Sequence, residues 1–134
     1  MLSRIEDIQE YTRSDAFSYC RQLDLIKSLV KSQEKVELST VIQNIGNDIS
    51  AMTAVPAAII SFLLNVEKGF EEVLYYSISL GGDTDTIASM ACSIAGALYG
   101  DERIPNHWKS KSENSLVLVK LASNLYESRC FDKK

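Results

Sequence analysis

Residues 81–98 read GGDTDTIASMACSIAGAL, and they contain both a clear helical pattern and a candidate functional site. In its second half, apolar residues recur at i, i+3, i+4, i+7, i+8 and i+11, the spacing of one face of an α-helix. These residues are Ile87, Met90, Ala91, Ile94, Ala95 and Leu98. Many residues here are small, so neighbouring helices can approach closely, and Gly100 is a typical helix end. The stretch therefore predicts a tightly packed helix that follows a turn at Gly81-Gly82.

The sequence on either side continues the helical pattern, so the expected fold is all-α. We expect further helices over residues 15–31, 37–46, 55–67 and 70–80, and a last, amphipathic helix that opens at Ser112 or at Asn114-Ser115. Residues 55–67 are apolar around most of the helix, which predicts a central position in the fold. Pro56 is expected in the first turn of this helix, with Thr53 as a candidate N-cap.

Residues 70–80 are the ambiguous segment. Val73, Tyr75 and Tyr76 favour a strand, whereas residues 70–74 favour a helix. No second convincing strand exists to pair with this one, and a single strand leaves its backbone polar groups unpaired. We therefore expect a helix here, and one compact multi-helix domain over residues 1–134.

Composition and charge narrow the class of protein. The chain has 134 residues, of which 46% are hydrophobic and 24% charged, as is ordinary for one globular domain. A formal net charge of −4 with scattered basic residues argues against nucleic-acid binding. No apolar run is long enough to span a membrane, and residues 1–7 do not read as a signal peptide. Cys20, Cys92 and Cys130 fit neither a disulfide framework nor a zinc site. These features predict an intracellular protein with no direct nucleic-acid or membrane contact.

Three oxygen-bearing side chains lie at the expected start of the helix that follows the double glycine. Asp83, Asp85 and Thr86 can converge on one point ahead of the first turn, and such ligands suit Mg²⁺ or Ca²⁺. The alternative is helix capping, for which Asp and Thr are preferred types. Capping uses a single side chain, however, and a second carboxylate two residues away adds repulsion that a shared cation removes. An EF-hand loop fits worse, because Ala88 stands where that loop needs glycine.

The residues around this motif carry a family resemblance. Residues 77–88 (SISLGGDTDTIA) resemble the C-terminal metal motif of the ADP-ribosylglycohydrolase superfamily. The flanking runs agree: IGNDI at 45–49, AVPAA at 54–58, AGALYG at 95–100 and IPNHW at 104–108. The nearest branch of the family removes ADP-ribose from serine and degrades poly(ADP-ribose). The resemblance extends from about Tyr19 to near the C-terminus.

The resemblance implies an all-α fold with two Mg²⁺ ions in a cleft. By it, Asp83 would bind one ion, Asp85 would bridge both, and Thr86 would bind through its hydroxyl. Ile49 matches a position that lines the ADP-ribose pocket, with Gly46 and Asn47 just before it, and Gly82 would let the backbone approach the ligand. The family commonly has glycine where this chain has Asp48, which adds a charge beside the expected ligand.

The largest departure from the family is a missing set of residues. Members carry a second metal motif, Thr-Asp-Asp, together with a catalytic glutamate and a phosphate-binding loop, and this chain has none of them. It is therefore similar to the C-terminal part of such an enzyme, and we assign it no catalytic residue. The expected function of the complete form is Mg²⁺-dependent hydrolysis of ADP-ribose linked to serine or within poly(ADP-ribose). The alternative is an inactive fragment or pseudoenzyme that acts as a binding or interaction module.

The resemblance also implies the partners and the compartment. The expected ligands are ADP-ribose, ADP-ribosylated protein or poly(ADP-ribose), bound by a protein that is monomeric when full-length. Family members act in the nucleus, the cytoplasm and mitochondria, so any of these is expected.

Overall fold

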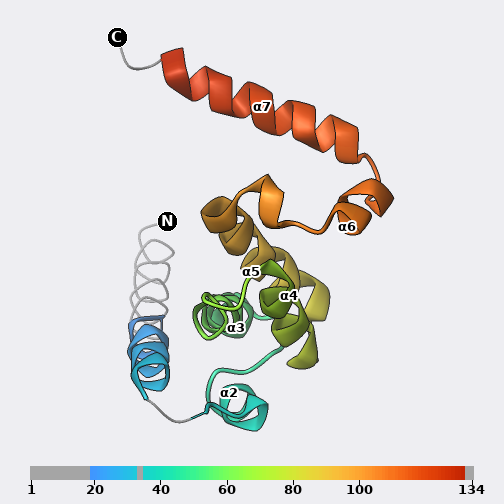
Figure 1. Ribbon diagram of the computed structural model, residues 1–134. Helices are drawn as coiled ribbons and strands as arrows, with labels where there is room; N and C mark the ends of the chain where they lie inside the picture. The colour runs from blue at the N-terminus through green and yellow to red at the C-terminus, as the bar shows by residue number, and fades with distance from the viewer. Residues whose placement is uncertain (1–18, 33–34, 132–134) are drawn as a thin grey trace, which may run out of the picture. The chain divides into compact units, whose positions relative to one another are not determined.

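The computed structural model describes residues 19–32 and 35–131, and no residue in these ranges belongs to a strand. Residues 19–31 are helical. The helices that follow are α2 (Leu38–Asn44), α3 (Ala51–Leu63), α4 (Phe70–Ser79), α5 (Thr84–Tyr99), the short 3-10 helix η1 (Asp101–Arg103), α6 (Asn106–Lys111) and α7 (Ser115–Phe131) (Figure 1). The all-α prediction is confirmed, and so is the helical assignment of residues 70–80. The start of the helix expected over residues 15–31 lies outside the described residues.

The chain divides into two compact units, residues 1–103 and residues 104–134. Each unit has contacts of its own and is treated separately below. The expectation of one domain over residues 1–134 stays a prediction, because a division by contacts does not measure whether the units fold independently.

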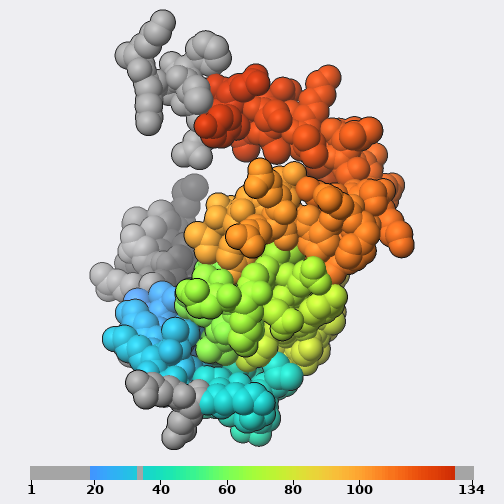
Figure 2. Space-filling model, in the orientation of Figure 1, coloured from blue at the N-terminus to red at the C-terminus, as the bar shows by residue number. Residues whose placement is uncertain are grey.

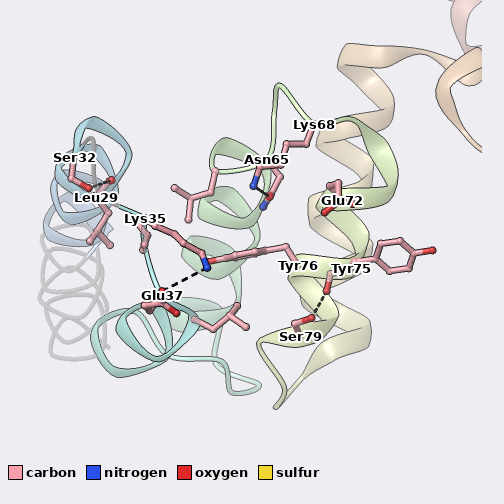
Figure 3. Close-up of a pocket in the computed structure, with 13 residues that line it drawn as sticks. Leu29, Ser32, Lys35, Glu37, Asn65, Lys68, Glu72, Tyr75, Tyr76 and Ser79 are labelled. Carbon is pink, nitrogen blue, oxygen red and sulfur yellow. Dashed lines mark hydrogen bonds and ion pairs between the residues drawn. The ribbon is translucent and has the colours of Figure 1, made fainter.

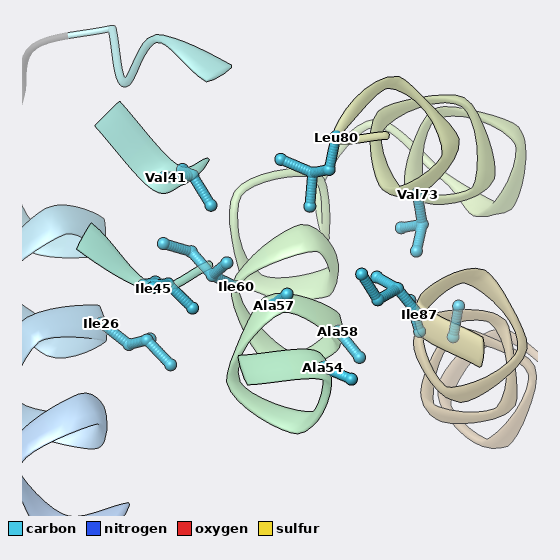
Figure 4. Packing of buried hydrophobic residues seen from close by; sticks show 12 residues of the cluster. Ile26, Val41, Ile45, Ala54, Ala57, Ala58, Ile60, Val73, Leu80 and Ile87 are labelled. Carbon is cyan, nitrogen blue, oxygen red and sulfur yellow. The ribbon is translucent and has the colours of Figure 1, made fainter. Parts of the chain in front are cut away.

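Helix α3 lies at the centre of the first unit. It packs against α4 and α5, and it contributes Ala54, Ala57, Ala58 and Ile60 to the buried apolar cluster. Figure 4 shows these residues between two groups of side chains. On one side lie Ile26, Val41 and Ile45, and on the other lie Val73, Leu80 and Ile87. The prediction that this apolar segment is central is therefore confirmed.

The start of α3 differs from the sequence expectation. The helix begins at Ala51, and its N-cap is Ser50, whose side-chain oxygen accepts a hydrogen bond from the Met52 backbone N–H at 3.2 Å. Thr53 is therefore inside the helix and Pro56 is in its interior, so both expectations were wrong. Serine is as good an N-cap as threonine. The missing N–H of Pro56 removes one hydrogen bond from the helix, and the buried environment of its ring favours keeping it there.

Helix α5 follows the prediction closely. It begins at Thr84, directly after the double glycine, and Gly100 ends it with a φ of 76°. Ile87, Ala91 and Ala95 are fully buried, which is how α5 approaches α3 and α4. The buried face is narrower than expected, because Ile94 and Leu98 are 37% and 59% exposed.

The second unit departs most from the sequence expectation. The connector expected after Ile104 contains helix α6. Helix α7 begins at Ser115, next to Asn114 with a φ of 56°, so the later of the two expected starts is right. The expectation of an amphipathic helix was wrong, because the exposed large apolar residues of α7 (orange to red in Figure 2) include four in a row and are therefore not confined to one face. They are Leu116, Val117, Leu118, Val119, Leu121, Leu125 and Tyr126. Within residues 19–32 and 35–131, no helix is long and apolar enough to cross a membrane.

Candidate metal site at the start of helix α5

The turn between α4 and α5 is built on two consecutive glycines. Gly81 has a φ of 70° and Gly82 a φ of 64°. This left-handed conformation is costly for residues with a Cβ atom and readily adopted by glycine. The Gly81 N–H donates to the Ile78 carbonyl at 3.1 Å, and the Thr84 N–H donates to the Gly82 carbonyl at 3.0 Å. The double glycine therefore turns the chain sharply and places Asp83 at the start of α5.

Asn47, from the loop before α3, holds this turn from both sides. Its side-chain Nδ2 donates to the Leu80 carbonyl at 2.7 Å. Its backbone carbonyl accepts from the Asp83 N–H at 2.8 Å. A Cβ atom on Gly82 would lie 2.0 Å from the Asn47 carbonyl oxygen, so the two backbones are in close contact. The structure thus brings together Asn47, Gly82 and Asp83, which the sequence analysis had singled out separately.

The carboxylates of the motif were considered as helix caps, and the structure shows how each is used. Asp83 occupies the N-cap position of α5, but within the described residues its side chain makes no capping hydrogen bond. Its backbone carbonyl accepts the Ile87 N–H at 3.0 Å. Asp85 and Thr86 are exposed, and Asp83 is partly exposed. The capping alternative considered from the sequence therefore does not account for Asp83, whereas Asp85 accepts one backbone N–H of the first turn of α5.

Asp85 has the more unusual electrostatic environment. A side-chain hydrogen bond with Asp83 lowers the pKa of Asp85, helped by the backbone N–H groups of Thr86 and of Asp85 itself. The Asp85 Oδ1 accepts from the Thr86 N–H at 3.0 Å. The Asp83 carboxyl group is thus the largest influence on the charge of Asp85. When both groups are ionised they repel each other, and protonation of one, or a cation between them, relieves the repulsion.

The donor set fits a hard divalent cation in part. Two carboxylates and one hydroxyl are oxygen ligands of the type that Mg²⁺ prefers, in a shell of six. The described residues hold no group of three or more His, Cys, Asp or Glu side chains arranged to bind a metal. Asp83, Asp85 and Thr86 would therefore hold Mg²⁺ together with ligands from elsewhere, such as water or another part of the complete protein.

The remaining predicted site residues lie in the loop that contains Asn47. Gly46 has a φ of 92°, and a Cβ atom there would lie 2.7 Å from the Thr53 side chain. The Ile49 side chain is 88% exposed, which leaves it available to a ligand. Their roles in substrate binding stay predictions. Sequence reasoning missed the hydrogen-bonding role of Asn47, because nothing in the spacing of 33 residues indicates which carbonyl its side chain meets.

Asp48 has a local structural role that the sequence did not indicate. Its Oδ1 accepts from the Ser50 N–H at 2.8 Å and from the Thr53 hydroxyl at 2.5 Å. The hydrogen bond from Thr53, followed by that from Ser50, lowers the pKa of Asp48. The carboxylate that replaces the family's usual glycine is thus bound to the start of α3.

A pocket of about 460 Å³ lies between the 19–32 segment, residues 35–38, the end of α3 and α4, and none of the predicted site residues lines it. Figure 3 shows Tyr76 reaching from α4 across this pocket towards Lys35 and Glu37, whereas Tyr75 points away. The Tyr76 hydroxyl is buried without a hydrogen-bond partner among the described residues. Burial, and then the charge of Glu37, raise its pKa. Lysines and glutamates both line the pocket, so its charge does not favour one class of ligand.

Comparisons with known proteins show which proteins the chain is similar to. The chain matches the ADP-ribosylglycohydrolase family over residues 1–133. It is 36% identical to the ADP-ribosylhydrolase ARH3 of Gallus gallus, over 97% of this chain and 40% of that protein. It is 40% identical to the ARH3 of Homo sapiens, over 86% of this chain and 33% of that protein. A shorter match, 34% identical over 45% of this chain and 16% of the relative, is to the ADP-ribosylarginine hydrolase Tri1 of Pseudomonas putida.

The matches cover nearly all of this chain but only part of its relatives. In the match to the Gallus gallus protein, 97% of the chain corresponds to about 40% of the length of that relative. The matched region contains the double-glycine turn, the paired carboxylates and the Asn47 loop, all of which are placed by the all-α fold described above. On the match over residues 1–133 and on the identity to these relatives, the chain belongs to the ADP-ribosylglycohydrolase family.

Proposed function

We propose that the complete protein is a Mg²⁺-dependent hydrolase of the O-glycosidic bond between ADP-ribose and serine, or of the bonds within poly(ADP-ribose). In this proposal the chain supplies one half of the metal site through Asp83, Asp85 and Thr86. Family membership and the relatives named ADP-ribosylhydrolase support the reaction class. The oxygen-only ligand set supports the choice of metal.

The observation that carries the proposal is the state of the two carboxylates. Asp83 stands at an N-cap position without a capping side-chain bond among the described residues, and it is the main cause of the lowered pKa of Asp85. Neither acid forms an ion pair with a basic side chain among the described residues. A cation held between them accounts for both.

The chain's own residues would position the ligands of the reaction rather than transfer a proton. Asp83 and Asp85 would hold the cation at the start of α5, and the Thr86 hydroxyl would complete their side of its shell. A bound Mg²⁺ supplies positive charge that orients hydroxyl-rich or phosphate-bearing ligands and polarises them. The exposed Ile49 side chain would add an apolar contact for the ligand. The general acid or base would come from outside this chain, which contributes positioning.

The relatives differ in the bond to ADP-ribose for which they are named. One shorter relative is named for ADP-ribosylarginine, whereas the matches that span most of the chain are named ARH3. The test is hydrolysis by the complete protein of three substrates, namely a serine-linked ADP-ribosyl peptide, poly(ADP-ribose) and an arginine-linked peptide. We expect release of ADP-ribose from the first two, with loss of activity in EDTA and recovery with Mg²⁺. Cleavage of the arginine-linked peptide alone, or turnover unaffected by EDTA, would refute the proposal.

A second candidate function, a binding or interaction module without activity, is favoured by helix α7. Its large apolar residues are exposed all around the helix, and exposed apolar surface of this kind marks contacts with other protein. Sedimentation of the 134-residue chain tests this candidate. Association that weakens when Leu118 and Leu121 are changed to glutamate favours a contact through α7, whereas a monodisperse monomer counts against it.

A further inference from the structure

We propose that Asn47 is a positioning residue for the carboxylate pair, which rests on the proposed function. In this role Asn47 does not touch the cation. It fixes the turn that carries Asp83 and Asp85, and so it sets the position of their carboxylates relative to α5. This differs from the substrate contact expected from the sequence.

Asn47 acts on the turn at both of its ends. Its side-chain Nδ2 donates to the carbonyl of Leu80, the last residue before the double glycine, at 2.7 Å. Its backbone carbonyl accepts from the N–H of Asp83, the first residue after the double glycine, at 2.8 Å. The two bonds therefore span the turn and hold its ends to one residue, from a loop 33 positions earlier in the chain.

The contact with Gly82 makes this arrangement specific. A Cβ atom on Gly82 would lie 2.0 Å from the Asn47 carbonyl oxygen and 2.9 Å from its Cγ. Both the backbone and the side chain of Asn47 are thus packed against the glycine, which is possible because residue 82 has no side chain. The adjacent Gly81 has more room, since a Cβ atom there would lie 3.7 Å from the Asn47 Nδ2.

The position of Asp83 depends on these contacts. Because its side chain makes no capping bond among the described residues, the backbone bond to Asn47 is what orients the residue ahead of α5. Groups that orient metal ligands from behind are important to affinity, and their loss typically costs about 10–100-fold in metal affinity or activity. One N–H of the Asn47 side-chain amide is meanwhile used by the Leu80 carbonyl.

The experiment compares Asn47→Ala with Asn44→Ala in the 134-residue chain. Asn44 is a matched control, because its Nδ2 also donates to a backbone carbonyl, that of Thr40, at 2.7 Å, but on the exposed surface of α2. Two readouts are taken from each variant. The first is the hydrogen-exchange rate of the Asp83 amide without metal. The second is the affinity for Mg²⁺ by calorimetric titration, with the circular dichroism spectrum as a check on folding.

We expect Asn47→Ala to speed exchange of the Asp83 amide and to weaken Mg²⁺ binding by about 10–100-fold, and Asn44→Ala to change neither. An unchanged exchange rate of the Asp83 amide in Asn47→Ala would show that the Asn47 side chain does not hold the turn, and it would overturn the proposal. Faster exchange with unchanged Mg²⁺ affinity would show a purely structural role and overturn the positioning role. If the unmodified chain binds no Mg²⁺ while exchange responds as expected, the half-site of the proposed function fails and the positioning role fails with it.

Should Asn47→Ala not fold, Asn47→Asp is measured instead. It keeps the shape but loses the donor to Leu80, and the same outcomes apply.

Discussion

Helices α3 and α5 both begin with aspartate and hydroxyl residues, but they use them differently. At the start of α3, Asp48 accepts hydrogen bonds from Ser50 and Thr53, and the Ser50 side chain accepts from Met52. At the start of α5, Asp83 makes no capping side-chain bond within the described residues. The comparison shows that residue type at a helix start does not reveal its role.

The two helix starts are also connected. Asn47 lies one residue before Asp48 in the loop that begins α3, and it bonds to both ends of the turn that begins α5. The loop whose Asp48 is bound to the start of α3 therefore also orients the turn that carries Asp83.

The largest expected effect comes from the same substitution at the two starts. In the complete protein, we expect Asp85→Asn to reduce hydrolysis by more than about 100-fold, since even groups that only support a metal ligand are worth about 10–100-fold. Asp48→Asn should leave hydrolysis near that of the unmodified protein and lower its thermal stability instead. Rates of ADP-ribose release and melting curves measure both. Equal loss of hydrolysis in the two variants would remove the distinction between the helix starts.

The double glycine offers a comparison between neighbours in the turn. Gly81→Ala and Gly82→Ala both place a Cβ atom at a positive φ, which costs roughly 1–2 kcal/mol. Gly82→Ala also overlaps the Asn47 carbonyl, and overpacking of this kind adds roughly 1–3 kcal/mol. Urea denaturation of the chain should therefore show a larger loss in the free energy of unfolding for Gly82→Ala. Similar losses in the two variants would mean that the close contact with Asn47 is absent in solution.

Truncating the two N-cap residues gives a smaller effect. Ser50→Ala removes a capping bond at α3 and should reduce the free energy of unfolding by about 1 kcal/mol. Asp83→Ala removes a side chain that caps nothing among the described residues, and it also relieves the repulsion with Asp85. In metal-free buffer it should therefore cost less than half as much as Ser50→Ala. A larger cost for Asp83→Ala, measured by urea denaturation, would restore the capping interpretation of the motif.

The smallest effect is a dependence of stability on acid pH. The hydrogen bonds from Thr53 and Ser50 lower the pKa of Asp48 in the folded chain, whereas the unfolded value is about 3.9. The folded state therefore gains stability from ionised Asp48 above pH of about 4, and loses it as the pH falls through the lowered pKa. Melting temperatures between neutral pH and pH 3 should fall less steeply in Asp48→Asn than in the unmodified chain. Parallel curves would indicate that Thr53 and Ser50 do not hold the carboxylate in solution.

Local patterns in the sequence predicted much of the fold. The helical periodicity of residues 87–98 and the glycine at position 100 predicted α5. Residues 55–67 are apolar around most of the helix, and this predicted the central position of α3. The predicted start of α3 was wrong, because Ser50, a better N-cap type than threonine, caps the helix, while Thr53 donates to Asp48 from inside the helix. Helix α6 was missed, because a helix of six residues has too few positions for a periodic pattern.

The sequence predicted which residues form the candidate site, but not the contacts that position them. The spacing of Asp83, Asp85 and Thr86 indicated convergence at a helix start. The structure places the three residues at the N-cap and in the first turn of α5, and the convergence of their side chains stays a prediction. The role of Asn47 was not predictable, because a side-chain bond to a carbonyl 33 residues away depends on the packing of α3 against α4 and α5. The same applies to Tyr76, whose buried hydroxyl faces a pocket that segments distant in the sequence form together.

The carboxylates at the start of α5 are proposed to bind a divalent cation. Titration of the ¹⁵N-labelled chain with substoichiometric Mn²⁺ measures this binding, because Mn²⁺ broadens the NMR signals of nearby amides even when binding is weak. We expect residues 83–87 and Asn47 to lose intensity first, and excess Mg²⁺ to restore them. The acidic pair Glu71 and Glu72 in the first turn of α4 is the internal control. Broadening that is equal at Glu71 and Glu72, or absent from residues 83–87, would contradict the claim.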